Sequence, residues 1–207
     1  MKKFGENKVY TKVPITEALK ATGKRPIGSR WIDINKGDSQ NPNYRSRLVA
    51  QEIKTDKRED LFAPTPPLEA KKMLCSLAVT ENYGYLKGDT EGGMKIMFID
   101  ISNAYFQAKT RRVVYVTLPQ EDYEEGMCGQ LAASMYGTRD AGMLWEECYR
   151  LALEQCGFVT GAANPCLFFH PQKNIEVVVH GDDFTALGTD EALDWYTEQL
   201  KAAFGAK

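Results

Sequence analysis

The stretch VVVHGDDFTALG, residues 177–188, decides how the chain is interpreted, because two adjacent carboxylates interrupt two apolar runs. The β-branched residues before the interruption and the apolar residues after it predict a buried β-hairpin. A hairpin turn is satisfied by one Gly or Asp. Asp182 and Asp183 together are therefore more charge than the turn requires. Two interpretations stay open at this point: solvent-facing turn residues, or a site that uses both carboxylates.

A third carboxylate, Asp100, ends the short apolar run KIMFID at residues 95–100. If that strand lies beside the hairpin, Asp100 converges with Asp182 and Asp183. Like charges at such distances repel unless cations lie between them. Two Mg²⁺ ions, held by the carboxylates and by substrate phosphates, would satisfy them. The residues alone thus predict a two-metal phosphoryl-transfer site and go no further.

Composition excludes several classes of protein. Of the 207 residues, 43% are hydrophobic and 26% are charged, which is typical of a globular protein with a real core. No apolar run is long enough to span a membrane, and the N-terminus resembles no secretion signal. We therefore expect an intracellular protein, cytoplasmic or nuclear, without a membrane partner. Five cysteines without CxxC spacing indicate reduced thiols and no disulfide or zinc framework.

Charge is distributed unevenly along the chain. Residues 1–112 contain 21 Lys and Arg against 13 Asp and Glu, whereas residues 113–207 contain 5 against 15. This asymmetry is typical of a polyanion-binding surface joined to a carboxylate region. The alternative is chance segregation on a solvated surface.

Periodicity predicts an α+β fold with an antiparallel sheet and helices packed on one of its faces. RWIDIN and YRSRLVAQ form a hairpin, Pro67 begins a helix that ends before Gly84, and Thr189 caps a last helix that Gly205 ends. The first of these helices has one apolar face, formed by Ala70, Met73, Leu74, Leu77 and Ala78. Further elements are expected at 113–119 (strand), 141–156 (helix) and in the strands CLFF and IEVVV.

Six segments in order resemble the reverse transcriptase domain of copia-type LTR retrotransposons, the RNA-dependent DNA polymerase part of a Pol polyprotein. They are KRPIGSRWIDINKGDSQNPNYRSRLVAQE, LFAPTPPLEAKKMLCSLAVTENYGY, FIDISNAYFQA with VVYVTLPQ, SMYGTRDAGMLWEECYRLALEQCGF, NPCLFF and VVVHGDDFTALG. Each segment alone is weakly specific, but six in register are strongly specific.

The resemblance implies polymerase fingers and a palm. Residues 1–90 would form the fingers, to which 108–132 return, and residues 91–107 and 133–207 would form the palm with its antiparallel sheet. We expect the thumb to be absent, and the thumb and RNase H regions to belong to the parent polyprotein. The implied partners are an RNA or DNA template-primer and dNTPs, whereas the oligomeric state is not predicted.

The resemblance also assigns roles to the acidic residues and their neighbours. Asp100 and Asp182 match the ligands of two Mg²⁺ ions, which Mn²⁺ could replace, and Asp183 supports the same site. The backbone carbonyl of Ile101 would also face a metal. Tyr105 matches the bulky residue under the incoming sugar, which excludes a 2′-hydroxyl and so selects dNTPs. The alternative for Tyr105 is a packed aromatic residue in a turn.

Three further residues match nucleotide-binding positions of the family. Arg47 matches the fingers arginine that clamps the triphosphate, for which a forked guanidinium is suited. Its alternative is an ordinary charge at a strand edge. Tyr136 and Gly137 match the start of the nucleotide and template segment, where a glycine lets the backbone approach a base.

The chain departs from the family at two places. His180 and Gly181 precede the aspartates where the family has an aromatic residue and a variable one, and we interpret Gly181 as loosening the turn. Asp140 and Gly142 stand where the family usually has Gln and Pro, and an acidic residue near template phosphate is unfavourable. One alternative function is therefore an inactive remnant of the same fold that binds nucleic acid or a protein. Another is a different two-metal enzyme, such as a nuclease or cyclase.

Overall fold

The chain folds into two compact units, and a computed structural model describes residues 4–5, 7–54, 61–86 and 93–205. Unit 1 comprises Met1–Leu61 and Tyr105–Trp145, and unit 2 comprises Phe62–Ala104 and Glu146–Lys207. The chain therefore passes from one unit to the other within the short helix α4 (Ala104–Gln107) and within α5 (Ala141–Gln155). Each unit is described by itself.

Unit 1 contains a three-stranded antiparallel sheet in the order β1-β6-β5 and a separate two-stranded hairpin. The elements are β1 (Tyr10–Pro14), α2 (Ile15–Thr22), β2 (Ser29–Asn35), β3 (Tyr44–Ala50), β5 (Tyr115–Val116), a 3₁₀ turn (Gln120–Asp122) and β6 (Met127–Leu131). The predicted hairpin is confirmed, because β2 pairs with β3 from Ser29↔Ala50 to Asn35↔Tyr44. The strand predicted at 113–119 is shorter than expected, and β1, α2 and β6 were not predicted.

Unit 2 is built on a five-stranded antiparallel sheet in the order β4-β10-β9-β8-β7. The strands are β4 (Lys95–Asp100), β7 (Val159–Thr160), β8 (Leu167–His170), β9 (Ile175–His180) and β10 (Asp183–Gly188). The predicted hairpin is β9 and β10, and β4 lies on its other side as its direct neighbour. In this register Asp183 is opposite Asp100 on one side and His180 on the other.

Helices cover both faces of this sheet, so the expectation of helices on one face is wrong. The helix α3 (Leu68–Ala78) packs Ala70 and Leu74 against Val178 and Leu187 on one face. On the opposite face Phe184 contacts Tyr149 of α5 at 5.6 Å between ring centroids.

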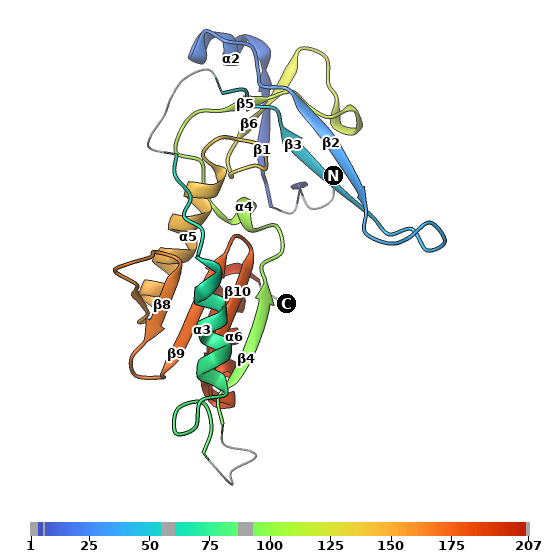
Figure 1. Cartoon of the computed structure of the whole chain (residues 1–207). Helices are drawn as coiled ribbons and strands as arrows, with labels where there is room; N and C mark the ends of the chain where they lie inside the picture. The colour runs from blue at the N-terminus through green and yellow to red at the C-terminus, as the bar shows by residue number, and fades with distance from the viewer. Residues whose placement is uncertain (1–3, 6, 55–60, 87–92, 206–207) are drawn as a thin grey trace. The chain divides into compact units, whose positions relative to one another are not determined.

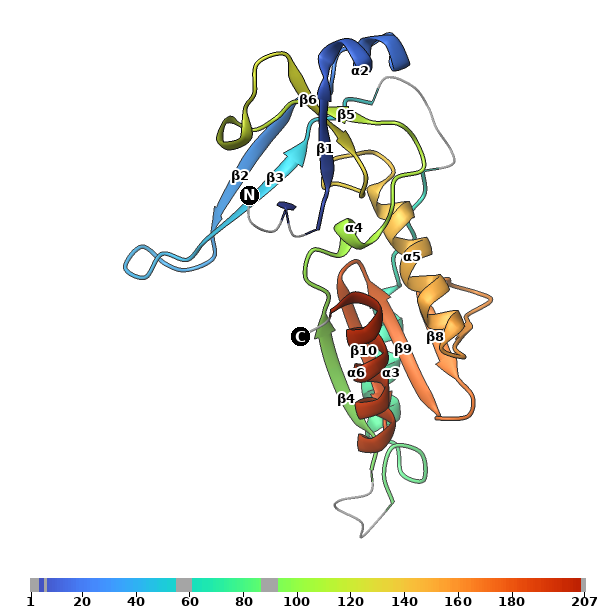
Figure 2. The ribbon, with the colours of Figure 1, turned by 180° about the vertical axis from the view of Figure 1, so that it is seen from behind.

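The last helix, α6 (Asp190–Phe204), lies on the α5 side of the sheet, where Thr197 donates a hydrogen bond to the sulfur of Met97. Figure 1 shows α3 in front of the sheet, and Figure 2, from behind, shows α6 in front of it. The coverage of both faces has a physical reason in residues 177–179, which are three consecutive valines. All three are buried. An uninterrupted apolar run is typical of a strand that is covered on both faces.

The helices keep most of their predicted limits. Thr189 caps α6 by accepting a hydrogen bond from the Ala192 N–H, and Gly205 ends it with a φ of 61°. The helix α3 begins after Pro67 as predicted but ends at Ala78, well before Gly84, and its Met73 is 60% exposed. Among the described residues, none of the helices is long and apolar enough to cross a membrane.

Candidate active site

Three carboxylates meet at the end of the unit 2 sheet. Asp100 is the last residue of β4, Asp183 is the first residue of β10, and Asp182 lies in the turn before it. One carboxylate oxygen from each residue lies within 4.8 Å of the other two. We call these residues the carboxylate cluster. The convergence expected from sequence is thus present, and three hard oxygen ligands at this spacing fit a divalent cation such as Mg²⁺ or Mn²⁺.

The turn that carries Asp182 has a defined geometry. Only Gly181 and Asp182 separate β9 from β10, and Gly181 has a φ of 65° whereas Asp182 is not among the residues with positive φ. A two-residue hairpin loop with positive φ at its first position alone matches a type II′ turn, which favours glycine there. Gly181 therefore supports the turn, and the interpretation that it loosens the turn is wrong.

Backbone hydrogen bonding fixes Asp182 against the neighbouring strand. The Ile101 N–H donates to the Asp182 carbonyl at 2.9 Å, and Ile101 is fully buried. The main chain after β4 is thereby held to the hairpin tip, which keeps Asp100 and Asp182 together. Whether the Ile101 carbonyl faces a metal stays a prediction. His180, opposite Asp183 on the same face of the sheet, is exposed.

The nucleotide-binding residues expected from sequence gather in unit 1. The Arg47 guanidinium carbon lies 5.3 Å from the centre of the Tyr136 ring, a cation–π arrangement. The Tyr105 ring meets the same Tyr136 ring edge to face, with 4.6 Å between centroids. Phe106 contacts Tyr136 from the core at 5.7 Å. One half-buried ring therefore links Arg47 to Tyr105, and the roles of all three residues stay predictions.

Gly137 has a reason within the fold itself. Its φ is 86°, and a Cβ at this position would lie 2.0 Å from the carbonyl oxygen of Ala50. The Ala50 N–H also donates to the Tyr136 carbonyl at 2.7 Å. Glycine is thus required so that the turn can lie against the end of β3. Whether the Gly137 backbone also approaches a base stays a prediction.

Residues 7–207 match the family described as Reverse transcriptase (RNA-dependent DNA polymerase). The chain belongs to this family. The match covers nearly the whole chain and confirms the resemblance to the domain found in copia-type retrotransposon Pol polyproteins. The family consists of RNA-directed DNA polymerases, which are nucleotidyltransferases that use divalent metal, and it implies nucleic-acid and nucleotide substrates.

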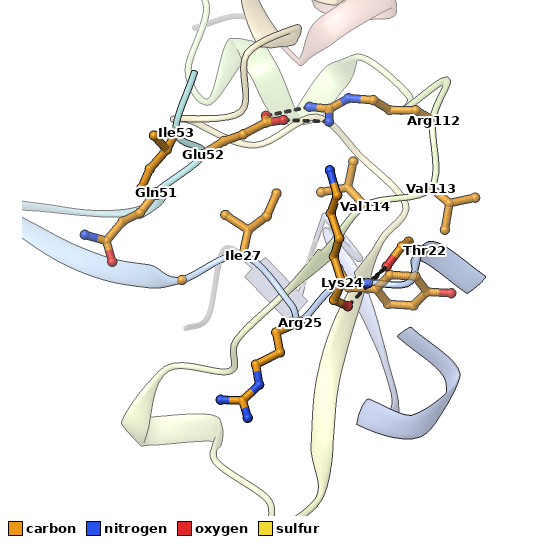
Figure 3. Close-up of a pocket in the computed structure, with 12 residues that line it drawn as sticks. Thr22, Lys24, Arg25, Ile27, Gln51, Glu52, Ile53, Arg112, Val113 and Val114 are labelled. Atoms are coloured by element: carbon orange, nitrogen blue, oxygen red, sulfur yellow. Dashed lines mark hydrogen bonds and ion pairs between the residues drawn. The ribbon is translucent and has the colours of Figure 1, made fainter. Parts of the chain in front are cut away.

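One group in this reverse transcriptase domain was missed by sequence reasoning. Arg112 donates to both carboxylate oxygens of Glu52, at 2.7 and 2.6 Å, and to both of Asp140, at 2.7 and 2.9 Å. We call Arg112, Glu52 and Asp140 the ion triad. Figure 3 shows the paired contacts between Arg112 and Glu52 at the wall of a cavity of about 480 Å³. No sequence signal connects Arg112 with a residue 60 positions away.

The ion triad changes the interpretation of Asp140. Its side chain is 7% exposed, and although burial raises the pKa of this carboxyl, the hydrogen bonds from Arg112 lower it on balance. The same two carboxylates raise the pKa of Arg112, Asp140 first and Glu52 second. Asp140 is therefore a paired, buried anion. Whether Asp140 lies near template phosphate stays a prediction.

Proposed function

We propose that this reverse transcriptase domain extends a primer by templated nucleotidyl transfer. The primer 3′-hydroxyl attacks the α-phosphate of a dNTP, and pyrophosphate leaves. The observation that carries the proposal is the carboxylate cluster, in which one carboxylate oxygen each from Asp100, Asp182 and Asp183 lies within 4.8 Å of the other two. Two divalent metal ions, Mg²⁺ or Mn²⁺, would supply charge stabilisation at the attacking and leaving oxygens when bound.

The protein residues have distinct tasks in this proposal. The carboxylate cluster binds the metal ions, and the hydrogen bond from Ile101 to Asp182 keeps two of its members in register. Arg47 clamps the triphosphate through its forked guanidinium. Tyr105 excludes a 2′-hydroxyl from the sugar position, and Tyr136 with Gly137 borders the nucleotide.

The proposal includes a division into polymerase fingers and palm. The fingers assignment covers residues 1–90 with 108–132, and the palm assignment covers 91–107 with 133–207. The sheet that holds the carboxylate cluster belongs to the palm in this scheme. Because α3 packs against that sheet, we assign α3 to the palm as well, although it falls in the first range.

Primer extension on a defined template tests the proposal. The wild-type chain, with Mg²⁺ or Mn²⁺, should add dNTPs only when template and primer are both present, and EDTA should stop the reaction. Asp182→Asn should abolish incorporation while the circular dichroism spectrum stays that of the wild type. No incorporation by folded wild-type protein would favour the inactive remnant. Template-independent use of NTPs would favour a cyclase.

A further inference from the structure

The turn at residues 136–139 is attached to the end of β3 at two points, and the ion triad provides one of them. The first point is the hydrogen bond from the Ala50 N–H to the Tyr136 carbonyl, at 2.7 Å. The second is a hydrogen bond from the Arg139 N–H to the Glu52 carboxylate, also at 2.7 Å. Glu52 can hold the turn only if its own side chain is fixed, and Arg112 fixes it with a bidentate pair.

Arg112 uses four of its five N–H donors within the ion triad. Nη1 donates to Glu52, Nη2 donates to both Glu52 and Asp140, and Nε donates to Asp140. The side chains of Glu52 and Asp140 are only 13% and 7% exposed. Removal of Arg112 would leave the buried carboxylate of Asp140 and the partly buried carboxylate of Glu52 without this cation, an arrangement that proteins avoid by moving the groups apart. The turn and the end of β3 would then separate.

The consequence reaches the proposed nucleotide site through Tyr136. This residue opens the turn, and its ring contacts both Arg47, at 5.3 Å, and Tyr105, at 4.6 Å. A shift of the turn therefore moves the ring against which both side chains are placed. The ion triad contacts the other end of the same turn, where the Arg139 N–H donates to Glu52 and the next residue, Asp140, accepts from Arg112.

We propose that Arg112 is a positioning residue for dNTP binding, which acts through the turn at 136–139 on the Tyr136 ring and so on Arg47 and Tyr105. Asp140 completes the ion triad and makes the position of this turn depend on Arg112. The inference rests on the proposed function, since it takes Arg47 and Tyr105 as nucleotide contacts.

Steady-state primer extension with Arg112→Met and Arg112→Lys tests the inference. Arg112→Met should raise the KM for dNTP by about 10-fold to 100-fold, because small misplacements of positioning groups have effects of this size. Its kcat should fall far less. Arg112→Lys keeps the charge but loses the fork, and it should lie between Arg112→Met and the wild type. Arg150→Met in α5 is the matched control, since it removes a similarly accessible arginine from ion pairs with Glu146 and Glu154 that include no residue of the turn at 136–139, and it should leave both constants unchanged.

Hydrogen exchange supplies a readout that needs no activity. In Arg112→Met the Arg139 amide and its neighbours should exchange faster, while the amides of β9 and β10 keep wild-type rates. A variant with lower thermal stability but unchanged KM and unchanged exchange at 136–139 would show that Arg112 only stabilises the fold, and the inference would fall. An inactive wild type would overturn the proposed function instead, and the exchange result alone would then decide whether Arg112 positions the turn.

Discussion

The two units carry opposite charge, although they belong to one short chain. Unit 1 contains 18 Lys and Arg against 13 Asp and Glu, and unit 2 contains 8 against 15. The proposed site residues divide in the same way. The cationic and aromatic residues Arg47, Tyr105 and Tyr136 belong to unit 1, and the carboxylate cluster belongs to unit 2. The groups suited to phosphates and the groups that require metal are thus supported by separate hydrophobic cores.

This difference leads to distinct expectations for the two units. Changes in unit 2 should act on the chemical step, because the carboxylate cluster would hold the ions that stabilise the reacting oxygens. Changes in unit 1 should act on nucleotide affinity and selection. A unit 1 variant that changes only the rate of the chemical step, or a unit 2 variant that changes only nucleotide affinity, would contradict this division of roles.

The largest effect is expected from Asp100→Asn. Loss of one carboxylate from the cluster should lower single-nucleotide incorporation at saturating dNTP by about 10³-fold or more, because transition-state charge is no longer stabilised. Asp190→Asn is the matched control, an exposed acid of the same unit that pairs with Lys95. It should change the rate by less than about 2-fold, since exposed ion pairs contribute little. An Asp100→Asn variant with near-normal rate would exclude Asp100 as a metal ligand.

A smaller effect, on selection, is expected from Tyr105→Val. The shortened side chain leaves room for a 2′-hydroxyl, so the ratio of kcat/KM for dNTP over rNTP should fall by about 10-fold to 100-fold. Tyr105→Phe keeps the ring and its contact with Tyr136, and it should keep the ratio. An unchanged ratio in Tyr105→Val would mean that Tyr105 only packs against its neighbours.

Substitution of Gly181, in the turn between β9 and β10, should lower the free energy of unfolding by about 1–2 kcal/mol. Gly181→Ala has open space around the new methyl group, but the φ of 65° is strained for a residue with a Cβ. Urea unfolding should show a lower free energy of unfolding by that amount. Gly181→Asn should lose less, because Asn is among the residues that occupy the positive-φ positions of hairpin turns. Equal losses in the two variants would contradict the argument from backbone conformation.

The sequence predicted unit 2 better than unit 1, for physical reasons. In unit 2 the decisive signals are local: Thr189 caps α6, Gly205 ends it, and the hairpin at 177–188 encloses its own turn. The position of Asp100 beside the hairpin could be predicted, because a carboxylate at the end of an apolar strand needs partners to compensate for its partial burial. The face covered by α3 was not predicted, because the short apolar run at 177–179 is compatible with a strand buried on one face or on both.

Unit 1 depends on contacts between distant parts of the chain. The strand β1 pairs with β6, so that Tyr10 is opposite Leu131. The sequence of β6, MCGQL, lacks β-branched and aromatic residues and contains a Gly, so it has little strand propensity of its own. The ion triad joins Arg112 to Glu52 and Asp140, which lie 60 and 28 positions away. Charged residues in a sequence do not indicate their partners, so the pairing of Asp140 with Arg112 was not predicted.

Asp183→Asn is expected to stabilise the fold of unit 2 when no metal is bound. The carboxylates of the cluster repel one another, so Asp183→Asn should raise the free energy of unfolding in EDTA by up to about 1 kcal/mol at these separations in water. Thermal unfolding of the wild type should rise with added Mn²⁺, and that rise should be reduced in the variant. A variant that is less stable than the wild type in EDTA would mean that Asp183 makes a stabilising contact.

The smallest effect near neutral pH is expected from protonation of Asp140 in unit 1, which should change the free energy of unfolding only in acid. Its pKa lies below the ordinary value of 3.8, because the hydrogen bonds from Arg112 outweigh the effect of burial. A depressed carboxyl pKa contributes stability that is complete above the ordinary value and is lost as the pH falls through the folded value. The difference in unfolding free energy between the wild type and Asp140→Asn should therefore be constant from about pH 7 to pH 5 and shrink only toward about pH 3. Urea unfolding at the three pH values measures it, and a difference that already shrinks above pH 5 would mean that Asp140 is not held as the anion in the ion triad.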